Sequence, residues 1–158
     1  MSENSITVEL IQKLDYRFDI HFAETIPVLT SDEPVPLGTG QGPSPVQLLC
    51  AAVGNCLSDS LLFALRKFKQ APEPLRCTVQ AEVGRNTDNR LRVLQMTATL
   101  RLGVPAAQLE HLDHVLAQFE AYCTVTQSIS QSIPVTLQVF DSTGMQLRQD
   151  PLTHKETP

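Results

Sequence analysis

The chain has 158 residues, the length of one ordinary domain, and 42% of them are hydrophobic, enough for a substantial core. The net charge of −5, with no Lys/Arg-rich run, argues against nucleic acid as a partner. Only 18% of the residues are charged, so we expect part of the surface to be buried between subunits. The N-terminal residues lack the basic and apolar regions of a signal peptide, which predicts a cytoplasmic protein.

The N-terminal part of the chain alternates between apolar and polar residues, which is typical of half-buried antiparallel strands. The alternation predicts a first strand over residues 6–10, a longer one over residues 14–22 and a short one over residues 26–30. Residues 31–45 are rich in Pro and Gly, and we therefore predict a loop there.

A long apolar helix is predicted to begin directly after this loop. Ser44, Pro45 and Gln47 combine an N-cap Ser, a Pro at the first helical position and a Gln that can complete a capping box. The helix should end near Phe68, with a length of roughly 35 Å. That length could cross a bilayer, but Asp59 and other polar residues interrupt its middle at a high cost in lipid. We interpret it as a buried core helix and expect no membrane association.

After this helix, apolar and polar residues alternate again as in strands, and farther along the chain apolar residues recur at helical spacing. Strands followed by a helix, a hairpin, further helices and a strand define an α+β fold. We predict one domain over residues 1–158, with a core over about residues 4–141 and a loose polar tail over residues 142–158. The remaining predicted elements are strands over 75–83 and 94–102 joined by a turn at 86–89, a helix opened by Pro105, a short helix after Cys123, and a strand over 135–139.

Four cysteines are the main candidates for chemistry, and none of them belongs to a zinc-binding pattern, so we predict no metal and no cofactor. Cys56 lies in the middle of the long helix within a polar cluster. It is either a small core residue or part of a specific site in which the polar groups find hydrogen-bond partners. Cys123 stands at a predicted helix start, where backbone N–H groups and the helix dipole favour a thiolate, although a core role is the simpler alternative. Cys50 and Cys77 are interpreted as core residues.

Several segments taken together resemble the OsmC/Ohr family. The resemblance covers about residues 4–141, and its most specific feature is a Gly-Pro-Ser-Pro helix entry followed by a mid-helix Cys. It implies an OsmC-like fold, in which antiparallel sheets surround a long central helix and two chains form an intertwined homodimer. The segments that carry it are 32–34, 42–49, 51–56 and 123–127.

The resemblance also implies a stress-response function, namely thiol-dependent reduction of organic hydroperoxides. In the family the peroxide oxidises one cysteine, matched here by Cys56, to a sulfenic acid. The second cysteine, matched by Cys123, condenses with it to a disulfide, and an external dithiol reduces the pair. The implied partners are therefore a second copy of the chain, an organic hydroperoxide and a dithiol reductant.

The sequence departs from the family's peroxidases at their supporting residues. Their Glu beside the helix start is replaced here by Val46 and Gln47, and an amide can hydrogen-bond but carries no charge. Arg17 is the best candidate for their Arg, and Thr124 stands where the family has a Pro. Two alternatives to a peroxidase therefore stay open: a non-catalytic OsmC-like dimer that binds a ligand or senses redox state, and a purely structural dimeric module.

Overall fold

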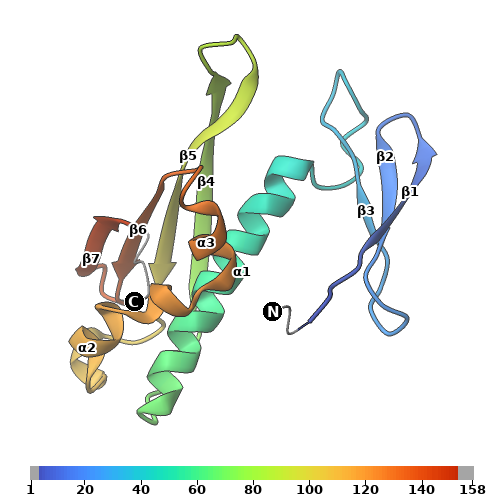
Figure 1. Ribbon diagram of the computed structural model, residues 1–158. Helices are drawn as coiled ribbons and strands as arrows, with labels where there is room; N and C mark the ends of the chain where they lie inside the picture. Colours follow the sequence, from blue (N-terminus) through green and yellow to red (C-terminus); the bar gives the residue numbers. More distant parts are fainter. Residues whose placement is uncertain (1–3, 153–158) are drawn as a thin grey trace. The chain divides into compact units, whose positions relative to one another are not determined.

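A computed structural model describes residues 4–152 of the chain. The described residues form strands and helices in mixed order, which confirms the predicted α+β class (Figure 1). The chain folds as two compact units, one that ends at Leu49 and one that begins at Cys50. The prediction of a single domain over the whole chain stays a prediction.

The first unit contains a three-stranded antiparallel sheet of β1 (Glu9–Leu14), β2 (Arg17–His21) and β3 (Leu29–Ser31), in that order. The predicted continuous strand over residues 14–22 is wrong, because a tight turn separates β1 from β2. Asp15 in this turn has a φ of 50°, and Leu14 pairs with Arg17 across it. Asp tolerates this left-handed conformation better than most residues, and the alternation continues through the turn, which hides it from the pattern.

The loop between β3 and the first helix is held together by one buried carboxylate, that of Asp32. The carboxylate accepts hydrogen bonds from the backbone N–H groups of Glu33, Thr39 and Gln41, and from the Thr39 hydroxyl at 2.6 Å. The hydroxyl hydrogen bond is the largest of the effects that lower the pKa of Asp32, against an opposing effect of burial. The predicted loop is therefore confirmed, and the hydrogen bonds to the Asp32 carboxylate fix its conformation.

Helix α1 (Pro45–Lys67) confirms the predicted long helix and its capping box. The Ser44 N–H donates to Gln47 Oε1 at 2.8 Å, and the Gln47 N–H donates back to Ser44 Oγ at 3.3 Å. Among residues 4–152, α1 is the one helix that is long and apolar enough to pass as a membrane span. One side of it is nonetheless buried against the protein, as expected of a core helix. The buried residues on that side are Val53, Gly54, Leu57, Leu61 and Leu65.

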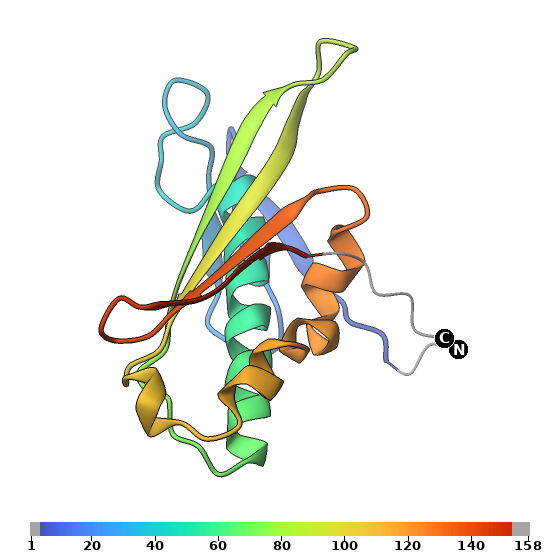
Figure 2. The same ribbon diagram turned by 90° about the vertical axis from the view of Figure 1, so that its left-hand side faces the viewer.

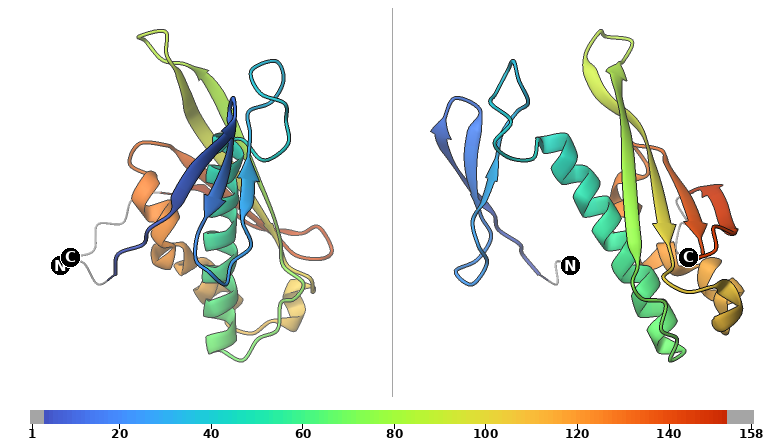
Figure 3. Two further views of the ribbon diagram at one scale, coloured as in Figure 1. Left: turned by 90° about the vertical axis from the view of Figure 1, so that its right-hand side faces the viewer. Right: turned by 180° about the vertical axis from the view of Figure 1, so that it is seen from behind.

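The second unit contains a four-stranded sheet of β4 (Arg76–Arg85), β5 (Leu91–Arg101), β6 (Val135–Phe140) and β7 (Gln146–Pro151), in that order. All neighbours are antiparallel except β5 and β6, which are parallel. Helix α1 runs along one face of this sheet (Figure 2). The predicted β4–β5 hairpin is confirmed, and its outer part projects beyond β6 and β7 (Figure 3).

Strand β7 corrects the prediction of a loose tail after Asp141. The strand pairs antiparallel with β6, and the turn before it is closed by the Asp141 carboxylate. That carboxylate accepts hydrogen bonds from the N–H groups of Ala106, Thr143 and Met145 and from the Thr143 hydroxyl. Because β7 is polar and only partly buried at the sheet edge, it lacks the alternation that marks a strand. Residues 153–158 of the predicted tail lie outside the described residues.

The segment between β5 and β6 is more broken than predicted. Instead of one helix opened by Pro105, the chain forms three short pieces, and His111 before the second has a φ of 58° that interrupts helical geometry. The short helix predicted after Cys123 is confirmed. The three pieces are the 3-10 turn η1 (Ala106–Gln108), helix α2 (Leu112–Leu116) and the 3-10 turn η2 (Phe119–Tyr122), and helix α3 (Thr124–Ile129) follows them.

Candidate thiol site

Cys56 lies in the middle of α1, half-buried beside residues that pack directly on the sheet. Gly54 allows this close packing, because an added Cβ would come within 2.9 Å of Val79 Cγ2 and 3.3 Å of Cys77 Sγ on β4. The polar cluster around Cys56 has an ordinary explanation. Asn55 donates to Asp59 at 2.9 Å on the exposed side of the helix, so the cluster by itself does not indicate a site.

Cys123 joins η2 to α3 and is fully buried. Its N–H donates to the Glu120 carbonyl at 3.0 Å, and its own carbonyl accepts from the Gln127 N–H at 2.9 Å. Its thiol donates to the Thr126 hydroxyl at 3.0 Å. Both the backbone and the sulfur of Cys123 are therefore held in place by local contacts.

The thiols of Cys56 and Cys123, remote in the sequence, come within interaction range of each other. Burial, followed by the contact with Cys56, raises the pKa of Cys123 to about 11, although hydrogen bonds with Thr126 oppose the shift. Cys123 is therefore a neutral thiol at neutral pH. The expectation of a Cys123 thiolate was wrong, because desolvation outweighs the dipole of a helix with only six residues.

Cys50 and Cys77 are not core residues, contrary to the prediction. Both are half-buried and line an open hollow of about 380 Å³ between α1 and β4, together with Asn55 and Ser58. Burial raises the pKa of both thiols, and a hydrogen bond with Ser58 partly offsets this for Cys77. The two thiols are therefore expected to stay protonated and slow to react.

The two predicted supporting residues, Gln47 and Arg17, both belong to the first unit. The Gln47 side chain is engaged in the capping box at the start of α1. Arg17 is half-buried on β2, and its Nε is a buried nitrogen without a hydrogen-bond partner among residues 4–152. A role for either residue at the thiols stays a prediction.

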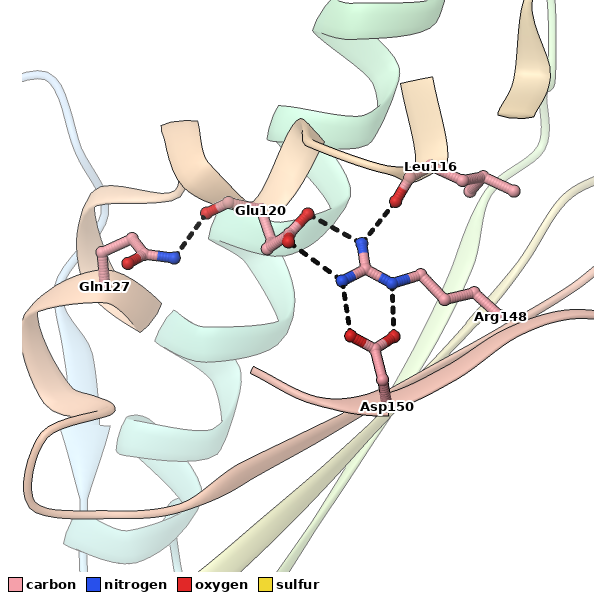
Figure 4. A network of polar contacts seen from close by, with 5 residues as sticks. All are labelled: Leu116, Glu120, Gln127, Arg148 and Asp150. Atoms are coloured by element: carbon pink, nitrogen blue, oxygen red, sulfur yellow. Dashed lines mark hydrogen bonds and ion pairs between the residues drawn. The ribbon is translucent and has the colours of Figure 1, made fainter. Parts of the chain in front are cut away.

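A network that the sequence did not reveal lies beside η2. Arg148 on β7 forms two hydrogen bonds with the Glu120 carboxylate, at 2.7 and 2.9 Å, and two with Asp150 (Figure 4). Burial opposes the charge of Arg148, but the hydrogen bonds to Asp150 and Glu120 raise its pKa above the ordinary value. No sequence signal pointed to it, since Arg148 falls in the predicted tail. Within residues 4–152, no three His, Cys, Asp or Glu side chains are grouped to hold a metal ion.

Comparison with known proteins agrees with this architecture. The model of the OsmC-like protein family matches residues 38–138, and the chain therefore belongs to that family. No curated protein matches the chain.

Solved structures share the fold at low sequence identity. An OsmC-like protein from Mycoplasma pneumoniae has a TM-score of 0.74 at 11% identity, covering 89% of this chain and 99% of its own. An organic hydroperoxide resistance protein from Elizabethkingia anophelis has a TM-score of 0.70 at 12% identity, covering 89% and 100%. The organic hydroperoxide resistance protein OsmC from Legionella pneumophila has a TM-score of 0.67 at 15% identity, covering 88% and 98%.

Proposed function

We propose that the protein reduces organic hydroperoxides in the cytoplasm at the expense of an external dithiol, with Cys56 as the peroxidatic and Cys123 as the resolving cysteine. The observation that carries the proposal is the contact between the two thiols, which are separated by 67 positions in the sequence. Thiols that interact directly meet the first requirement for a disulfide, which is that the two sulfurs can reach each other. The names of two of the structural neighbours, organic hydroperoxide resistance proteins, favour the same substrate class.

The cycle needs only the two thiols, the peroxide and a dithiol. The Cys56 thiolate attacks the terminal oxygen of R–O–O–H, the O–O bond breaks, and an alcohol leaves with a proton while Cys56 becomes a sulfenic acid. The Cys123 sulfur then attacks Cys56, the disulfide forms, and the sulfenic hydroxyl leaves as water with the Cys123 proton. The external dithiol exchanges with this disulfide and restores both thiols. The raised pKa of Cys123 supports a resolving rather than a peroxidatic role for this residue, because a protonated thiol is a poor nucleophile.

An aromatic hollow that reaches Tyr122, the residue before Cys123, favours an organic rather than an inorganic peroxide. The hollow, of about 120 Å³, lies between the end of α1 and the η2 segment, and Tyr122 next to Cys123 forms part of its wall. Its lining is mostly apolar, with Lys67 and Gln118 as polar members, and can take up the hydrocarbon part of a substrate. The aromatic residues of the lining are Phe63, Phe68, His114, Phe119 and Tyr122.

We further propose that the working form is a homodimer and that Arg17 stabilises the Cys56 thiolate. Many large apolar side chains stand in water, among them Phe63 on α1 at 64% exposure and Leu14 on β1 at 55%, and their number favours a covering partner. The buried Arg17 Nε without a partner among the described residues leaves a donor available for an anion.

The decisive experiment measures consumption of an alkyl hydroperoxide with dithiothreitol as the reductant. Cys56→Ser is expected to abolish turnover, and Cys123→Ser to prevent the intramolecular disulfide, so that excess hydroperoxide oxidises the Cys56 sulfenic acid further to a sulfinic acid. Cys50→Ser and Cys77→Ser are the matched controls and should keep full activity. A Cys56→Ser protein as active as the wild type would refute the proposal.

A non-catalytic redox-sensing or ligand-binding dimer is the second candidate. It is favoured by Gln47, whose amide is engaged in the helix cap and cannot supply the carboxylate of the family's peroxidases. This candidate predicts that peroxide forms the Cys56–Cys123 disulfide only slowly and that added dithiol does not sustain turnover. Rapid multiple turnover would exclude it.

A further inference from the structure

The segment that carries Cys123 cannot hold its shape alone. η2 has four residues and α3 has six, far below the length at which an isolated helix is stable in water. The geometry of Cys123 must therefore be set by contacts from elsewhere in the fold.

Arg148 on β7 provides one such set of contacts, which is largely buried. Its Nη1 donates to the Glu120 carboxylate and to the Leu116 carbonyl, Nη2 donates to Glu120 and Asp150, and Nε donates to Asp150 (Figure 4). These are all five N–H donors of a guanidinium, so Arg148 has none left for a substrate. The Glu120 and Arg148 side chains are only 4% and 13% exposed, so water competes little with these hydrogen bonds.

Glu120 connects this network to the thiol. While its carboxylate holds Arg148, its backbone carbonyl accepts the Cys123 N–H at 3.0 Å and the Gln127 side-chain amide at 3.1 Å. The ion pair on one side of η2 is thus joined to the start of α3 through a single residue. Movement of Glu120 would displace Cys123 directly.

We propose that Arg148 is a positioning residue that holds Cys123 in place to intercept oxidised Cys56. The inference rests on the proposed function. A sulfenic acid at Cys56 has two fates: condensation with the Cys123 thiol, which releases water, or attack on a second hydroperoxide, which gives a sulfinic acid and an alcohol. Only the first fate depends on the placement of Cys123, and misplacement by about 1 Å can cost roughly a hundredfold in rate.

The test measures the hydroperoxide concentration at which half of Cys56 becomes sulfinic acid, by mass spectrometry of the intact protein in single-turnover reactions without reductant. This midpoint reports the ratio of the two fates and does not depend on the rate of the first oxidation. Arg148→Met is expected to lower the midpoint roughly tenfold, because Cys123 is released. Arg66→Met is the matched control, since Arg66 also makes two hydrogen bonds to a carboxylate, that of Glu73, but on an exposed surface.

Two further variants make the result decisive. Arg148→Lys keeps the charge but cannot reproduce the five hydrogen bonds, and should give an intermediate midpoint. Asp150→Asn, at the more exposed side of the network, should lower the midpoint by a smaller factor, and it decides the test if Arg148→Met does not fold. Equal midpoints in the folded variants and the wild type would overturn the inference. A wild-type protein that forms no Cys56–Cys123 disulfide would instead refute the proposed function.

Discussion

The two units of the chain bury their apolar residues to different degrees. In the second unit, alternate residues of β5 and β6 and one side of α1 form a closed core, with Leu57, Leu100 and Leu137 fully buried. In the first unit, the sheet leaves most of its large apolar residues exposed, including Leu14 at 55%. Alternation in the sequence therefore identifies a face that can be covered, but it does not show what covers it.

The exposed sheet of the first unit supports the proposed homodimer. A small sheet needs a covered apolar face for stability, so this many exposed apolar residues in one small unit favour a covering partner. The exposed apolar residues of the first unit include Leu10, Ile11, Leu14, Tyr16, Phe22, Ile26 and Val28.

The largest effect on the free energy of unfolding is expected from replacing a leucine in the closed core, in comparison with an exposed leucine of the first unit. Leu57→Ala should lower the free energy of unfolding by about 2–5 kcal/mol, because it leaves a cavity in a closed core. Leu14→Ala should cost less than about 1 kcal/mol if Leu14 stays exposed. Chemical denaturation followed by circular dichroism measures both. A large Leu14→Ala effect that depends on protein concentration would show that a partner covers the first sheet.

An intermediate effect is expected at two crowded glycines, one in each unit. A Cβ on Gly42 would lie 2.0 Å from the Thr30 carbonyl oxygen, whereas a Cβ on Gly54 would meet side-chain atoms of Val79 and Cys77. Each Gly→Ala change should destabilise its unit by about 1–3 kcal/mol, and Gly42→Ala more, because backbone cannot move aside as side chains can. Hydrogen exchange of β1–β3 and β4–β7 amides reports the two units separately. Equal protection in Gly42→Ala and the wild type would contradict this.

The smallest expected effect concerns acid. Hydrogen bonds, that from the Thr143 hydroxyl being the largest effect, lower the pKa of Asp141 from 3.8 to about 2. Because the folded state binds the proton less readily than the unfolded state, Asp141 stabilises the fold fully above about pH 4, and this contribution disappears as the pH falls through 2. Asp32 in the first unit is shifted in the same direction.

Unfolding curves recorded from pH 5 to about pH 2 should therefore show a steeper loss of stability for the wild type than for Asp141→Asn. Asp32→Asn is the matched variant in the other unit. If Asp141→Asn lost stability with the wild-type slope, Asp141 would not be the group responsible.

Local signals in the sequence were sufficient for the elements with strong local rules. The long apolar run together with Ser44 and Gln47 predicted α1, and the two alternating runs predicted the β4–β5 hairpin. The same signals failed at Asp15 and His111, where a left-handed residue interrupts a continuous pattern. They also failed at β7, which is polar and lies at the sheet edge.

By itself, the sequence determined the α+β class and the long capped helix, because capping and alternation act over a few residues. Its motifs also gave the resemblance to the OsmC/Ohr family, and that resemblance singled out Cys56 and Cys123. The contact between the two thiols, the neutral state of Cys123 and the Arg148 network depend on tertiary structure alone. Each of them arises from burial and from groups that are distant in the chain, and no local pattern records which distant groups will meet.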